Sequence, residues 1–204
     1  LDVTGSATFT EDNSLKTLTI GPSIAGESRM RAEVTRDGLG AYTMAVSGAA
    51  FNSTYFWKEL SRDDARGARP QNAESTPLKL TAKFDRMWLA KDGDFKDVDL
   101  AFERGKAGIQ AIDFKSHVAD TPFNLTLTSA EGKRTFIGVS ENGGAVVRAV
   151  GLFKDIQGGQ FSIKGEFEAN GTVKGSAEIA NFKLVEAPPL ARLLSVAALS
   201  GILD

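Results

Sequence analysis

Few side chains in this chain are able to carry catalysis. His117 is the only histidine, and it lies in the segment DFKSHVAD close to Asp113. An imidazole next to a carboxylate is a common general base, but it needs a nucleophile to activate. The chain has no cysteine and no G-x-S-x-G, P-loop or H-E-x-x-H motif. We therefore expect no catalytic residue, no cofactor and no enzymatic activity, and we interpret His117 as a surface or structural polar residue.

A run of carboxylates between Asp92 and Asp99 is the one candidate for metal binding. Asp92, Asp94, Asp97 and Asp99 offer the oxygen ligands that calcium prefers. Their spacing is not that of an EF-hand loop, and Asp99 belongs to an alternating strand pattern. We predict a solvated turn followed by a strand face, and no metal site.

The phenylalanines point to apolar contact rather than to reaction chemistry. The chain has thirteen Phe against two Tyr and two Trp, and most of the Phe fall on the apolar side of predicted strands. Phe has no polar atom, so a surface built from it must be dry or must touch other apolar material. In a closed sandwich these side chains fill a core, whereas in an open twisted sheet they line a trough that fits acyl chains. The pattern alone favours core filling, and the periodicity does not separate the two arrangements.

Period-two alternation dominates the sequence and predicts antiparallel strands in meander order, each with one buried face. Asn142-Gly143 and similar pairs predict hairpin turns between them. A short helix is expected to begin at Asn52 or Ser53, a second to cover Gly144–Asp155, and an apolar third to cover Pro188–Asp204. Gly158-Gly159 predicts a helix stop before the strand pair Gly159–Glu168 and Thr172–Val185. The predicted fold class is thus mainly β, a twisted and groove-like or partly open sheet with a few short helices, with a closed sandwich or barrel as the alternative.

The polar stretch 61–77 carries no periodicity and predicts a linker or loop. It separates a predicted N-terminal β module, 1–60, from a C-terminal β module with the terminal helix, 78–204.

Charged residues make up 25% of the chain and the net charge is −2, so we expect no nucleic-acid partner. The sequence contains neither a signal peptide nor a long apolar span and opens within a strand pattern. We expect it to be a fragment of a longer protein.

Two C-terminal segments carry a family resemblance: GGQFSIKGEF and VKGSAEIANFKLVEAPPLARLLSVAALSGILD. Together they resemble the C-terminal region of the AsmA-like superfamily, near its YhdP and TamB branches. The likeness covers 78–204 best and extends loosely to SGAAFNSTYFWKEL at 47–60. Members are envelope proteins of Gram-negative bacteria, anchored in the inner membrane, that carry phospholipid along a β-sheet groove. The resemblance implies a periplasmic location. It also implies phospholipid acyl chains as partners and contact with the inner and outer membranes through the parent protein, and it allows an envelope protein partner.

The resemblance and the alternation together predict a non-enzymatic lipid-binding or lipid-transfer groove segment. The alternative is a scaffold or assembly module in outer-membrane biogenesis that has a closed core and acts through protein contacts. The groove-lining positions follow from the alternation alone. They are Phe84, Leu100, Phe102, Ile112, Phe114, Phe123, Leu125, Leu127, Ile137, Phe161, Ile163 and Phe167.

Overall fold

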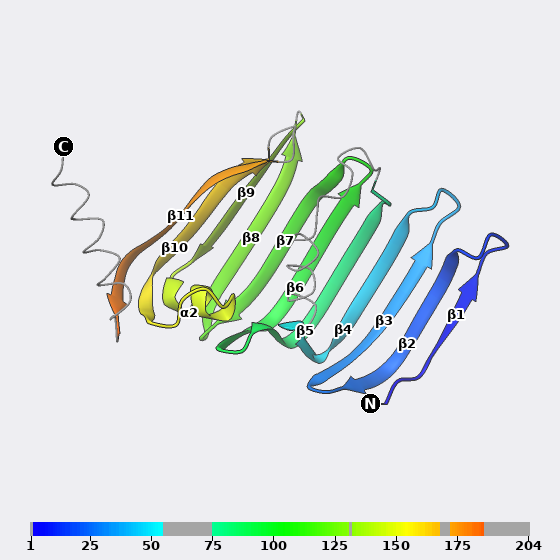
Figure 1. The fold of residues 1–204 in the computed structure, drawn as a ribbon, viewed down its shortest axis with the longest axis horizontal. Helices are drawn as coiled ribbons and strands as arrows, with labels where there is room; N and C mark the ends of the chain where they lie inside the picture. Colours follow the sequence, from blue (N-terminus) through cyan, green and yellow to red (C-terminus); the bar gives the residue numbers. More distant parts are fainter. Residues whose placement is uncertain (1, 55–74, 131, 168–171, 186–204) are drawn as a thin grey trace, which may run out of the picture.

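The computed structural model describes residues 2–54, 75–130, 132–167 and 172–185. In these residues the chain is mainly β, with eleven strands that form one open sheet in sequence order (Figure 1). The strands are β1 (Gly5–Phe9), β2 (Leu15–Ala25), β3 (Ser28–Arg36), β4 (Tyr42–Asn52), β5 (Leu78–Ala90), β6 (Gly93–Gly105), β7 (Gly108–Val118), β8 (Thr121–Ala130), β9 (Lys133–Ser140), β10 (Ile156–Phe167) and β11 (Val173–Leu184).

One strand pair departs from the predicted meander. All neighbours are antiparallel except β4 and β5, which are parallel, with Tyr42 opposite Leu78. A parallel pair needs a long crossover, because the chain must return to the edge from which the first strand started. The residues between Asn52 and Leu78 provide that length. The expectation of an entirely antiparallel meander is therefore wrong at this one step, which is also where the linker 61–77 was predicted.

The helix α2 (Gly143–Ala149) lies between β9 and β10 and begins at a capped residue. The amide of Ala145 donates to the Asn142 side-chain oxygen at 3.1 Å, which makes Asn142 the N-cap. The prediction of a hairpin turn at Asn142-Gly143 is therefore wrong. The helix is also shorter than predicted, because Gly151 has φ +77 and ends it well before Asp155.

The glycine pair before the last two strands also differs from the prediction. Gly158 and Gly159 lie inside β10, both with positive φ, and not between a helix and a strand. A Cβ at Gly159 would lie 2.8 Å from the Ala180 carbonyl oxygen, so only glycine fits there. The strand pair itself is confirmed, as β10 and β11. The helix expected from Asn52 or Ser53 lies outside the described residues beyond Thr54, as does the apolar helix Pro188–Asp204.

The main core lies where α2 covers one face of the sheet at one strand-end edge (Figure 1). Phe95 and Val118 are almost completely buried there, each with 1% of its surface exposed. Ala145, Val146 and Ala149 are the helix residues that belong to this core. Their burial holds α2 in place, since a helix this short is not stable without tertiary packing.

Candidate functional site

One face of the sheet, which we call the apolar face, carries two rows of side chains that cross all eleven strands. Every position in both rows is apolar or glycine, because successive residues of a strand alternate between faces and the register keeps the apolar positions side by side. The outer row, farther from α2, is Ala7, Leu18, Val34, Met44, Leu80, Phe102, Ile112, Leu127, Phe136, Gly165 and Gly175. The middle row is Gly5, Ile20, Ala32, Val46, Ala82, Leu100, Phe114, Leu125, Gly138, Ile163 and Ala177.

Exposure changes along the strands of the apolar face. Near α2, Phe84, Val98 and Phe123 are buried, and their rings and branches pack into the core beneath the helix. In the outer row, Phe102 and Ile112 are only half-buried. Leu127 and Val34 are exceptions, because only 3% and 5% of them are exposed although they lie in the outer row. The apolar face thus runs from a protein core at one edge to partly accessible apolar side chains toward the other.

Aromatic rings pack against one another on the apolar face between β6 and β10. Phe114 contacts Phe95 and Phe123, with ring centroids 5.5 and 5.8 Å apart, and Phe123 contacts Phe161 at 6.2 Å. Edge and tilted arrangements of this kind stabilise ring pairs beyond the area they bury. The rings therefore form one connected aromatic strip across these strands.

Glycines in the two rows leave room for their larger neighbours. A Cβ at Gly165 would lie 2.6 Å from the ring of Phe136, so that ring extends over the backbone of β10. A Cβ at Gly138 would lie 2.8 Å from Ile163 and 3.1 Å from Leu125. Large side chains next to glycine fill the gap between strands, which keeps this part of the apolar face continuous.

The structure brings together all but one of the residues predicted to line a groove. Phe84, Leu100, Phe102, Ile112, Phe114, Phe123, Leu125, Leu127, Phe161, Ile163 and Phe167 share the apolar face. The prediction is wrong for Ile137. It pairs with Thr126 and Lys164 on the opposite face and is 55% exposed.

Phe136 is the aromatic residue that the alternation missed. The connection between β8 and β9 pairs Ala130 with Lys133, and this register sets Leu127 opposite Phe136. The β-branched pair Ile137 and Val139 looked like the apolar side of the strand, because glycine and serine follow Phe136 on its own side. The short turn held the correct signal, since a two-residue hairpin connection fixes the register.

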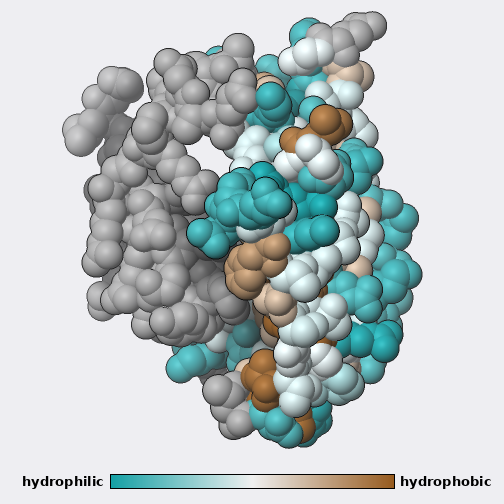
Figure 2. Space-filling view, turned by 90° about the vertical axis from the view of Figure 1, so that its right-hand side faces the viewer, coloured by the Kyte–Doolittle hydropathy of each residue, from teal (hydrophilic) through white to brown (hydrophobic). Residues whose placement is uncertain are grey.

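The opposite face is polar, and its charges pair across strands. Lys79 contacts Glu103 at 2.6 Å and Lys83 contacts Asp99 at 3.0 Å. The hydrogen bond that Lys79 donates to Glu103 raises the pKa of Lys79. Viewed from the β1 side, hydrophilic residues gather along the right-hand border of the described surface, and apolar residues appear only in separate groups (Figure 2). Because the pairs are exposed, each contributes little to stability.

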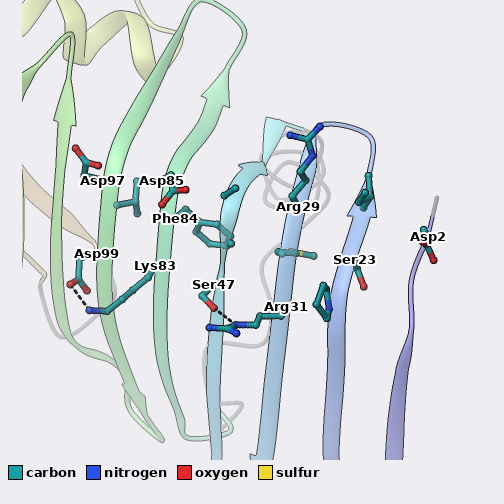
Figure 3. Close-up of a pocket in the computed structure, with 16 residues that line it drawn as sticks. Asp2, Ser23, Arg29, Arg31, Ser47, Lys83, Phe84, Asp85, Asp97 and Asp99 are labelled. Carbon is teal, nitrogen blue, oxygen red and sulfur yellow. Dashed lines mark hydrogen bonds and ion pairs between the residues drawn. The ribbon is translucent and has the colours of Figure 1, made fainter.

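A shallow hollow of about 830 Å³ lies between β2 and β6 and brings both signs of charge together. Arg31 donates to Ser47 at 2.9 Å, Lys83 pairs with Asp99, and Asp85 and Asp97 lie nearby (Figure 3). The cationic and acidic groups largely neutralise one another. This arrangement favours neither an anion nor a cation.

The residues considered from the sequence for catalysis or metal binding are dispersed among separate ion pairs. His117 lies 3.3 Å from Asp97, while Asp113 contacts Lys115 and Asp94 contacts Arg86. No group of three or more histidine or carboxylate side chains in the described residues is placed to hold a metal ion. Within the same residues, no helix has the length and apolarity needed to cross a membrane.

Comparisons with protein families, curated proteins and solved structures find no match to this chain. They assign it to no family. The AsmA-like resemblance therefore remains a prediction, and the apolar face carries the functional argument.

Proposed function

We propose that the chain is a non-enzymatic lipid-binding segment of a periplasmic protein that transfers phospholipid between the inner and outer membranes. The observation that carries this proposal is the pair of unbroken apolar rows, whose outer members Phe102 and Ile112 stay half-buried. A run of partly accessible apolar side chains across a sheet matches the shape and chemistry of acyl chains. The polar opposite face would remain in water.

The energetics support a binding mode without a headgroup site. Each methylene removed from water contributes about 0.8 kcal/mol, so an acyl chain along several strands gains enough to be held. A continuous apolar surface gives similar energy at successive positions. A lipid would therefore slide along the rows without crossing a large barrier, and no reactive residue is needed for that movement.

Lipid extraction and native mass spectrometry of the chain purified from an envelope fraction test the proposal. We expect phospholipid to be bound to the chain without substitutions. Phe102→Asp or Leu125→Asp should lower the bound amount by about tenfold or more, because an ionised carboxylate facing hydrocarbon costs several kcal/mol. Ile137→Asp is the matched control, since Ile137 lies on the polar face and is 55% exposed.

Circular dichroism of each variant keeps the result interpretable, and Phe102→Ser provides a milder change if the aspartate variant does not fold. Folded Phe102 and Leu125 variants with native amounts of lipid would overturn the proposal. An equal loss in Ile137→Asp would also overturn it, because the lipid would then not depend on the apolar face.

A scaffold role is the second candidate, and β11 favours it. This strand ends the sheet, and most of its residues are exposed over Val173–Leu184. An exposed end strand offers backbone groups to which a partner strand can add. A stoichiometric protein partner in a preparation without phospholipid would support this function over lipid transfer.

A further inference from the structure

Exposed apolar residues gather at the strand-end edge that carries α2. Leu152 and Phe153, just after the helix, are 68% and 49% exposed, and Leu184 and Val185, at the end of β11, are 40% and 38% exposed. The amide of Val185 donates to the Asp155 carbonyl at 2.8 Å, which fixes the end of β11 beside the loop. We call Leu152, Phe153, Leu184 and Val185 the edge patch.

The backbone that presents the edge patch is ordered by hydrogen bonds. Gly151 donates to the Arg148 carbonyl at 2.9 Å and Leu152 to the Val147 carbonyl at 2.8 Å, which is the Schellman pattern of helix ends. In that motif the apolar residue after glycine normally packs back onto the last turn of the helix. Here Leu152 instead stays mostly exposed. The local structure therefore holds an apolar side chain in water, which costs free energy unless something else covers it.

Cationic side chains surround the edge patch. Lys154 follows Phe153, Lys183 precedes Leu184, and Arg148 lines the hollow beneath the loop. Lys91 extends from the neighbouring turn between β5 and β6, where Asp92 also lines that hollow. Among the described residues, no carboxylate forms an ion pair with Lys91, Lys154 or Lys183. Among the described residues around the edge patch, these four cations outnumber the carboxylates of Asp92 and Asp155, so this described part of the surface is net positive.

We propose that the edge patch docks the sheet onto the surface of a phospholipid bilayer that contains anionic lipid. Leu152 and Phe153 enter the boundary between headgroups and acyl chains, while the lysines lie among the phosphates. The charge complementarity selects a bilayer as the occupant, because apolar tips ringed by cations fit an anionic lipid surface. The inference rests on the proposed function, since the edge patch would bring the end of the apolar rows to the membrane that exchanges lipid.

Flotation of the full chain with vesicles tests this docking surface. The probes are vesicles of phosphatidylcholine mixed with phosphatidylglycerol, and vesicles of phosphatidylcholine alone. We expect the chain to float with the mixed vesicles and to bind the neutral vesicles more weakly. The double variant Leu152→Asp/Phe153→Asp should bind the mixed vesicles at least about tenfold more weakly, because it removes two inserting side chains and adds two negative charges.

Leu39→Asp is the matched control. Leu39 is 96% exposed in the turn between β3 and β4, at the opposite edge of the sheet, so this variant removes an apolar residue that is even more exposed than Leu152 and lies far from α2. It should float as the unchanged chain does. The replaced residues are exposed in both variants, so circular dichroism should show both folded.

Three results would overturn the docking surface. They are failure of the unchanged chain to bind mixed vesicles, native binding by the double variant, and an equal loss of binding in Leu39→Asp. The lipid content of the purified double variant separates this inference from the proposed function. Retained phospholipid with lost flotation supports docking through the edge patch. Native flotation of a chain that never carries phospholipid would refute the lipid-transfer function alone.

Discussion

The two ends of the apolar face have the same residue types but different surroundings. Beneath α2, Phe95, Val98 and Phe123 are buried and form part of a conventional core. In the outer row, Phe102 and Ile112 continue the same alternation yet stay half-buried. The alternation determines which face a side chain occupies, whereas burial depends on what packs around it, since Leu127 and Val34 are buried in the outer row although neither belongs to the core beneath α2. Under the proposed function, the same apolar stripe would serve stability at one end and lipid binding at the other.

The largest expected effect is the difference in lost free energy of unfolding between alanine substitutions at the two ends of the apolar face. Phe95→Ala should lower the free energy of unfolding by about 3–5 kcal/mol, because a buried ring leaves a cavity that α2 cannot close. Phe102→Ala should cost about 1–2 kcal/mol, since less of its surface leaves water on folding. Urea unfolding followed by circular dichroism measures both. Equal losses would show that the outer row is as much a core as the α2 end.

A smaller effect is expected where glycine makes room for an aromatic ring. Gly165→Ala should cost about 1–3 kcal/mol, because the new Cβ would lie 2.6 Å from Phe136 and 2.5 Å from the Lys174 carbonyl oxygen. Gly38→Ala, in the turn before β4, is the control, since a Cβ there meets no atom within 4 Å. The same unfolding assay compares them. A neutral Gly165→Ala would mean that the outer row is loosely packed between β9 and β10.

The smallest effects belong to the polar face and depend on pH. The hydrogen bonds that Lys79 donates to Glu103 and Lys115 donates to Asp113 raise the pKa of both lysines above 10.5. A raised pKa in the folded state stabilises the fold below the ordinary lysine value, and this contribution is lost as pH rises through the raised pKa. The urea midpoint should therefore fall slightly above pH 10.5, and less so in Glu103→Gln. A midpoint that rises there would contradict the pairing.

Much of this fold follows from local sequence signals. The strands and their apolar sides could be predicted, because alternation acts within a few residues, and the last strand pair is confirmed as β10 and β11. The parallel step between β4 and β5 could not be predicted, since it depends on where a long connection leads the chain. Gly151 ended α2 early through its positive φ, and this signal was available in the sequence.

The candidate site was predictable in composition but not in exposure. Alternation placed its residues correctly apart from Ile137, for which the register of the β8–β9 turn was the better guide. Burial depends on what packs over the sheet. The helical segment of α2 was predicted, but nothing in its sequence states that it lies over Phe95 and leaves Phe102 half-buried. The edge patch was missed for the same reason, since an exposed Leu152 and a buried leucine look alike in a sequence.

The most direct test of the central claim is photo-crosslinking from single positions on the two faces. A benzophenone amino acid at Phe102 reports on the outer row, and the same group at Ile137 reports on the polar face within the same sheet. The account predicts phospholipid adducts from position 102 and none from position 137 when the chain is irradiated in an envelope fraction. Adducts at both positions, or only at 137, would contradict binding along the apolar face.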